Sequence, residues 1–184
     1  MNQPWKITAG GQIVLVKPDV WLFPAGAWND VEEALGTNLP ADYKDLIGDG
    51  LACIFDEELL ISSPFDPDSG LNLLVTAAAT AFSLAYVRAD YPEAYPYPIY
   101  PEPGGLLGWG MDGGGGQYHW ATAPPDPDTW TVVVSGRPVS DPYVQDQGVG
   151  LTSFLSALAS GEIRAAALAD WPSPNAATKR RESS

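Results

Sequence analysis

The chain has 184 residues, a length that suits one domain, and 45% of them are hydrophobic, enough to supply a core. Its formal net charge is −14. The acidic residues are not confined to a terminal tail, since residues 28–178 carry 21 acidic and four basic side chains. Such a surface repels nucleic acid and anionic membranes, so neither is expected as a partner, and it attracts basic proteins. The alternative is that the acidic residues only keep the protein soluble, or suit a salty cell.

Residues 1–27 are expected to form an N-terminal extension with strands at residues 13–16 and 21–23. The break between them, Lys17 to Asp19, interrupts the apolar stretch that a secretory signal would need. The single cysteine, Cys53, excludes an internal disulfide framework and is compatible with a reducing compartment. We therefore expect a cytoplasmic protein, and the sequence leaves its oligomeric state open.

Two short helices are predicted next. The first begins at an Asn29 cap, with Glu32 three residues later as in a capping box, and ends at Gly36. The second opens with Pro40 at its first helical position and ends near residues 48–50. The apolar positions expected to face the core here are Trp28, Val31, Leu35, Tyr43, Leu46 and Ile47.

A strand pair at residues 53–55 and 59–61 follows, joined by the acidic loop Asp56-Glu57-Glu58. Residues 71–89 form the longest predicted helix, and the segment after it, residues 91–103, is rich in proline and tyrosine and is expected to be extended. The long helix is too interrupted to span a bilayer. Polar residues recur along it every fourth position, which marks one polar face of a buried helix: Asn72, Thr76 and Thr80.

Three strands are predicted in the second half, at residues 106–110, 117–121 and 129–134, with a glycine-rich loop at 112–116. Short links between consecutive strands indicate an antiparallel meander. A last helix begins at a Thr152 cap and ends at Gly161, its apolar positions being Phe154, Leu155 and Leu158. Helices at both ends of an antiparallel sheet predict an α+β fold in one domain, residues 28–172, followed by a disordered tail at 173–184.

The residues that could carry chemistry are few. Residues 108–113 match the G-x-G-x-x-G pattern, but they lead into a hairpin loop rather than a helix, so they do not predict a nucleotide site. His119 is the only histidine, and no pattern brings it together with Cys53 or a serine. We therefore expect no catalytic residues, no metal and no cofactor, with His119 a structural or interface residue and Cys53 a small core residue.

The order of these segments resembles the SUKH superfamily, which includes fungal cell-wall-assembly regulators and bacterial immunity proteins. One stretch, Leu39-Pro40-Ala41-Asp42-Tyr43, is similar to the "LP-x-D-Y" start of that family's second helix. The other stretches are Trp28 with residues 31–36, then residues 61–65, 105–110, 118–120, 128–130 and 154–155 ahead of 160–163. Together they cover about residues 28–163. The chain departs from the family pattern in its N-terminal extension, its glycine-rich loop and its Pro-Tyr segment.

The resemblance implies an α+β fold with a mostly antiparallel sheet and a protein-binding role rather than catalysis. It also implies a cognate toxin domain, often a nuclease, as the basic partner. In this hypothesis exposed aromatic residues anchor the partner and acids steer it. The residues assigned to binding are Asp56, Glu57, Glu58, Trp109, Asp112, Tyr118, Asp126 and Asp128, whereas Trp28, Tyr43 and Trp130 are assigned to the core. The alternatives are a regulatory scaffold without a toxin partner, and a small carbohydrate-binding or carbohydrate-active protein.

Overall fold

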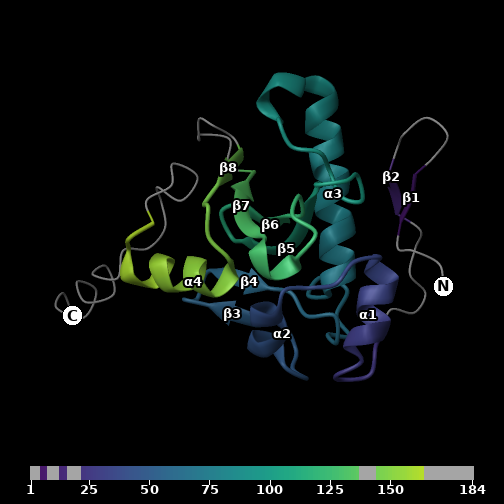
Figure 1. Cartoon of the computed structure of the whole chain (residues 1–184), viewed down its shortest axis with the longest axis vertical. Helices are drawn as coiled ribbons and strands as arrows, with labels where there is room; N and C mark the ends of the chain where they lie inside the picture. Colours follow the sequence, from purple (N-terminus) through teal and green to yellow (C-terminus); the bar gives the residue numbers. More distant parts are fainter. Residues whose placement is uncertain (1–4, 8–12, 16–21, 137–143, 164–184) are drawn as a thin grey trace.

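A six-stranded antiparallel sheet forms the centre of the fold (Figure 1). The computed structural model describes residues 5–7, 13–15, 22–136 and 144–163. Each strand of the sheet pairs with the next along the chain, which confirms the predicted meander and the α+β class. The strands are β3 (Cys53–Phe55), β4 (Leu59–Ile61), β5 (Leu106–Asp112), β6 (Gln117–Ala121), β7 (Thr131–Ser135) and β8 (Val144–Asp146).

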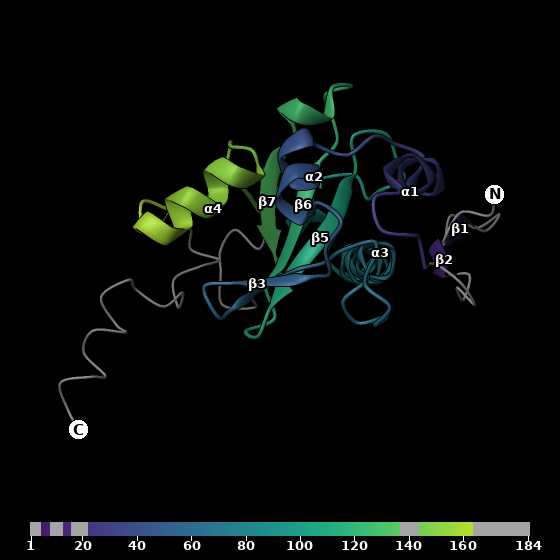
Figure 2. The ribbon, with the colours of Figure 1, turned by 90° about the horizontal axis from the view of Figure 1, so that it is seen from below.

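Helices cover both faces of this sheet (Figure 2). One face is covered by α2 and α4, and the opposite face by α3, with α1 beside α3. Strands β1 and β2 form a separate two-stranded sheet. The bounds of these elements are α1 (Trp28–Leu35), α2 (Ala41–Ile47), α3 (Leu73–Asp90), α4 (Leu151–Ser160), β1 (Trp5–Ile7) and β2 (Ile13–Leu15), with short 3₁₀ turns η1 (Pro92–Ala94) and η2 (Pro127–Thr129).

The predicted capping box at the start of α1 is wrong. The helix begins at Trp28 with no side-chain cap, and Glu32 instead holds the connection to α2. Its Oε1 accepts a hydrogen bond of 2.9 Å from the Leu39 N–H and lies 2.8 Å from Lys44 Nζ. The predicted end is confirmed, because Gly36 adopts the left-handed conformation, with φ 85°.

Carboxylates from distant segments cap the N-termini of α2 and α4. Pro40 lies one position before α2 rather than at its first residue, and the Ala41 N–H donates to Asp128 Oδ1. Thr152 lies inside α4 and does not cap it; its N–H and hydroxyl donate to Asp42 Oδ2 at 3.0 and 3.2 Å. These bonds join α2, η2 and α4, and negative charge at a helix N-terminus is stabilising.

Aromatic rings fill the space between the sheet and the α2–α4 layer. Trp120 is the centre of this group, with its ring 5.0 Å from that of Tyr43 on α2 in an edge-to-face contact. The Tyr118 ring lies 5.9 Å from that of Phe154 on α4. Burial of Tyr43 and Trp130 confirms their assignment to the core, and half-buried Trp28 packs against it. Leu46 was expected there as well but is 41% exposed.

The opposite face of the sheet packs closely on α3. The inner side of the helix is buried, and the polar residues of the predicted face point inward: Thr76 Oγ1 lies 2.8 Å from Ser62 Oγ, and Thr80 packs over Gly108 of β5. Asn72 caps the helix, since its side chain accepts a hydrogen bond from the Leu74 N–H. Because Gly108 has no side chain, α3 can lie close to the sheet at this position.

Replacing Gly108 by alanine should lower the free energy of unfolding by about 1–3 kcal/mol, because the added methyl group overpacks this contact. The new Cβ would lie 2.8 Å from Thr80 Cβ and closer still to Thr80 Oγ1. Chemical denaturation measures the loss. The double variant Gly108→Ala/Thr80→Ala should recover part of it; equal stability of Gly108→Ala and the unaltered chain would contradict the packing.

Some elements differ from the expected ones. Strands β1 and β8 were not predicted, and residues 22–23 form no strand. The Pro-Tyr segment is held to α3 by the Arg88–Glu102 ion pair, whose two N–O distances are 2.9 and 2.7 Å. This pair raises the pKa of Arg88 and lowers that of Glu102. Trp21 and the tail after residue 172 lie outside the described residues.

Candidate functional site

His119 lies on β6 with its side chain fully buried. Its Nε2 is 2.8 Å from Ser135 Oγ on β7, and its Nδ1 has no hydrogen-bond partner. Burial lowers the pKa of the imidazole to about 3, so the ring is neutral at physiological pH. His119 is therefore closed off from solvent and packs between the strands of the sheet.

The buried imidazole makes stability depend on pH. The folded pKa is below the unfolded value of about 6.5, so the unfolded chain binds the proton first and stability falls as pH drops through 6.5 towards 3. In the variant His119→Gln this contribution is absent. From pH 7 to pH 5, the free energy of unfolding of the unaltered chain should therefore fall by about 2 kcal/mol relative to that of the variant, as measured by denaturant titration. A constant difference would mean that His119 is accessible to protons in the folded state.

Cys53 is far from this histidine. It lies on β3, at one edge of the sheet, three strand spacings or about 14 Å from β6. Its side chain packs against the core on the α2 side, near Tyr43, and burial raises the pKa of the thiol. Cys53 and His119 therefore do not form a nucleophile–base pair. Within residues 22–136 and 144–163, no three side chains of the metal-binding types are grouped to hold an ion.

Trp109 and Tyr118, predicted as exposed anchors, belong to the core. Both are fully buried, with ring centroids 5.5 Å apart. Tyr118 points into the α2–α4 layer by the ordinary alternation of a strand. Trp109 reaches the same layer because β5 has an irregularity between Gly108 and Gly110, which places an extra residue opposite β6. The assignment of these two residues to a partner surface is therefore wrong.

Asp112 was also assigned to binding, yet it organises the glycine-rich loop from within. Its side chain is 8% exposed. The carboxylate accepts hydrogen bonds of 2.8 and 2.9 Å from the N–H groups of Gly114 and Gly116 and one of 2.7 Å from the Tyr118 hydroxyl. Because the Asp112 carboxylate is used by these hydrogen bonds within the protein, it is not presented to a partner.

The other five predicted acids are exposed but lie at two separate ends of the sheet. Asp56, Glu57 and Glu58 form the β3–β4 turn, and the pairing of Leu59 with Asp112 puts that turn beside the glycine-rich loop. Asp126 and Asp128 lie at the other end of β6, about 16 Å away along a five-residue strand. Asp126 accepts a hydrogen bond from the Asp128 N–H, and Asp128 also caps α2, which leaves the three acids of the β3–β4 turn as the candidates for binding a partner.

The turn that carries these three acids has an unusual backbone. Asp56 and Glu57 have φ of 51° and 62°, and the Glu58 N–H donates to the Phe55 carbonyl, as in a type I′ turn. Such turns favour Asn-Gly or Asp-Gly because both central residues need positive φ. A glutamate in this region costs free energy, and residues held in that way concentrate at functional sites.

An apolar row runs across the sheet beside this turn. Ile54 pairs with Leu60, and Leu60 pairs with Met111, so the three side chains line up across β3, β4 and β5. Ile54 is 68% exposed and the other two are half-buried. We call the row together with Asp56, Glu57 and Glu58 the sheet-end surface. The row was missed because residues 53–55 and 59–61 are apolar at every position, and alternation therefore gives no sign of which side faces solvent.

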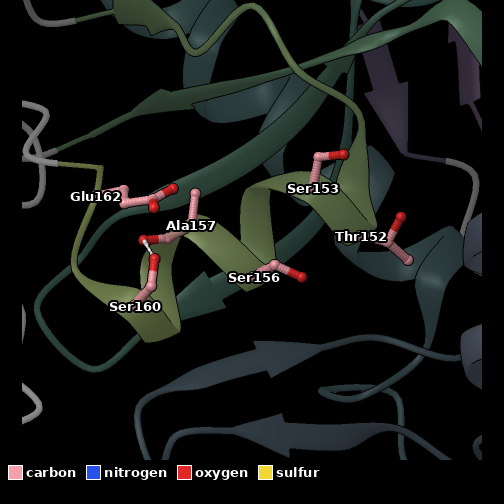
Figure 3. A pocket seen from close by; sticks show the side chains of 6 residues that line it. All are labelled: Thr152, Ser153, Ser156, Ala157, Ser160 and Glu162. Carbon is pink, nitrogen blue, oxygen red and sulfur yellow. Dashed lines mark hydrogen bonds between the residues drawn. The ribbon is translucent and has the colours of Figure 1, made fainter.

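A depression of about 510 Å³ lies on the outer side of α4, away from the sheet-end surface (Figure 3). Hydroxyl groups dominate its lining, and Glu162 supplies the single charge among the lining residues. The Ser160 hydroxyl is already bonded to the Ala157 carbonyl. A shallow, open hollow with one carboxylate offers neither a carboxylate pair nor an aromatic platform for a sugar.

Comparison with known proteins gives no relative: no family model matches the chain, and neither a curated protein nor a solved structure does.

Proposed function

We propose that this chain is a non-catalytic protein-binding module of the immunity type, which neutralises a basic toxin domain by binding it at the sheet-end surface. The observation that carries the proposal is the association of three free carboxylates with an exposed apolar row on an edge strand. Interfaces combine an apolar centre with a charged rim, and Ile54 with its neighbours fits the centre as Asp56, Glu57 and Glu58 fit the rim.

The charges of the turn suit a basic partner. All three side chains project from a tip at the end of the sheet and are exposed, so an approaching cation meets no neighbouring positive group on the turn itself. A nuclease domain needs a basic cleft for nucleic acid, and an acidic protein competes for that cleft. The presence of Asp-Glu where Asn-Gly would fit the backbone better supports a role for the charge itself.

The proposal includes membership in the SUKH superfamily. The sequence stretches that resemble this family fall on the elements that build the sheet and its aromatic layer, including α2, β5 and β6. An antiparallel meander with helices on both sides agrees with the architecture that the resemblance implies. The full burial of His119, and its separation from the half-buried Cys53 on the edge strand, support binding rather than hydrolysis as the activity.

Co-expression tests this function. The gene beside the one for this chain is expressed in a host, and the proposal expects its product to arrest growth and the intact chain to restore it. The variant Asp56→Lys/Glu57→Lys/Glu58→Lys should fail to restore growth. A matched control, Asp30→Lys/Glu33→Lys/Glu93→Lys, changes net charge equally at exposed acids of α1 and η1 and should still restore it.

A neighbouring product without toxicity that still binds the chain would favour the regulatory scaffold. Failure of both triple variants would show that overall charge matters and the sheet-end surface does not. Restoration by both variants would contradict the proposed binding site.

A further inference from the structure

Strand β3 is the last strand at one edge of the six-stranded sheet, so its outer side has no partner among the described strands. In an antiparallel sheet, successive residues of a strand direct their backbone groups to opposite sides. In the chain that continues β4, the Ser62 N–H donates to the Trp109 carbonyl of β5. Leu59 and Ile61 therefore direct their backbone groups to β3, where they pair with its first and last residues. Ile54, the middle residue of β3, consequently directs its N–H and C=O away from the sheet.

The free edge around Ile54 is short, and both of its ends are defined. Before β3, the Ala52 N–H is already bonded to Asp66 Oδ2 at 3.1 Å. After β3, the chain turns back at Asp56. Ile54 thus offers one donor and one acceptor, and its side chain is 68% exposed beside them. An edge with unpaired backbone groups is a template for the addition of a strand from another chain.

We propose that the partner at the sheet-end surface adds an extended segment to β3, antiparallel to it, with an apolar residue opposite Ile54. This inference rests on the proposed function and names the part of the partner that the site recognises. Ile54 and the residue opposite it exchange two backbone hydrogen bonds, and their side chains lie on the same face. The apolar row of Ile54, Leu60 and Met111 is thereby extended onto the added strand, which is the β-augmentation mode of recognition.

Charge complementarity sets the sequence of the added segment. The three carboxylates of the β3–β4 turn follow β3 directly. In an antiparallel pair, the residue two positions before the apolar one lies next to this turn and on the same face as the apolar residue. We therefore expect a lysine or arginine there, in the pattern basic-x-apolar. A second copy of this chain suits the edge less well, because β3 has no basic residue and each copy carries a formal net charge of −14.

Proline at position 54 tests the backbone contact. Ile54→Pro removes the outward N–H, which bonds to no described strand, and proline is tolerated at such positions of an edge strand. Ile54→Ala is the matched control, because it also loses the isoleucine side chain but keeps the N–H. Calorimetry measures binding of the product of the neighbouring gene. The Kd of Ile54→Pro should exceed that of Ile54→Ala about tenfold or more, since a bound carbonyl loses its donor.

Residue-resolved hydrogen exchange in the unaltered chain gives a second reading that needs no substitution. In the free chain, the amide of Ile54 should exchange faster than those of Cys53 and Phe55, because only these two are bonded to β4. The partner should slow exchange of the Ile54 amide about tenfold or more. Protected amides of β5 and β6 verify the fold of each variant, and if Ile54→Pro fails this check, the exchange of the Ile54 amide in the unaltered chain decides.

Strand addition is overturned if Ile54→Pro and Ile54→Ala bind equally well, or if the Ile54 amide exchanges as fast in the complex as in the free chain. If charge reversal at residues 56–58 still weakens binding in that case, the proposed function stands and the partner is held by side chains. A product that does not bind the unaltered chain overturns both. A free chain that elutes as a dimer, with an Ile54 amide protected in proportion to protein concentration, assigns the edge to a second copy and also overturns the inference.

Discussion

Replacing Trp109 by alanine is expected to lower the free energy of unfolding by about 3–5 kcal/mol, a large fraction of the stability of a typical domain. The ring is fully buried and lies 5.5 Å from Tyr118 and 5.9 Å from Trp120, at the centre of the layer between the sheet and the α2–α4 helices. Its removal leaves a cavity that these large neighbours cannot fill. Equilibrium unfolding in denaturant measures the loss.

The matched control is Ile54→Ala, which truncates an apolar residue at 68% exposure and should change stability by about 0.5 kcal/mol or less. Trp109→Ala therefore tests the packing of the core, whereas Ile54→Ala tests the proposed binding surface with little effect on stability. If Trp109→Ala were as stable as the unaltered chain but bound its partner poorly, Trp109 would be an anchor at the interface, and its place in the core would be contradicted.

Reversing the three charges of the β3–β4 turn is expected to slow association with the partner by about tenfold to a hundredfold at low salt, within the range of electrostatic steering. The off-rate should change less, because rim charges act mainly on diffusional encounter. Ile54→Ala should do the opposite and raise the off-rate, since an apolar anchor is held by packing. Stopped-flow mixing with the proposed toxin domain resolves the two rates.

The control for this prediction is the triple reversal at Asp30, Glu33 and Glu93, which changes net charge by the same amount away from the sheet-end surface. Its association rate should fall much less. A neutral variant, Asp56→Asn/Glu57→Gln/Glu58→Gln, keeps side-chain shape and should show an intermediate rate. Equal slowing by both triple reversals would assign the effect to net charge alone.

Much of the fold was predictable because its signals are local. The meander follows from short links between apolar segments, and the ends of α1 and α4 follow from Gly36 and Gly161, both left-handed in the structure. The starts of α2 and α4 were wrong because the carboxylates that bond to them come from distant segments. Asp128 bonds to Ala41 across 87 positions of the sequence, and no local pattern contains that information.

Less of the site was predictable. The acids at residues 56–58 were found because three consecutive carboxylates between two strands indicate an exposed turn. Trp109 was misplaced because the irregularity beside it shifts its face, and Asp112 because its loop folds back onto its carboxylate. Ile54 was missed because burial on β3 depends on its position at the sheet edge, which only the strand order reveals.

Binding of a basic protein at the sheet-end surface is tested most directly by the association rate with the proposed toxin domain, measured as a function of ionic strength. Screening shortens the reach of exposed charges from about 30 Å at 0.01 M to about 3 Å at 1 M. We expect a rate that falls steeply with salt in the unaltered chain and only weakly in Asp56→Lys/Glu57→Lys/Glu58→Lys. A rate that is indifferent to salt, and equal in the two chains, would contradict it.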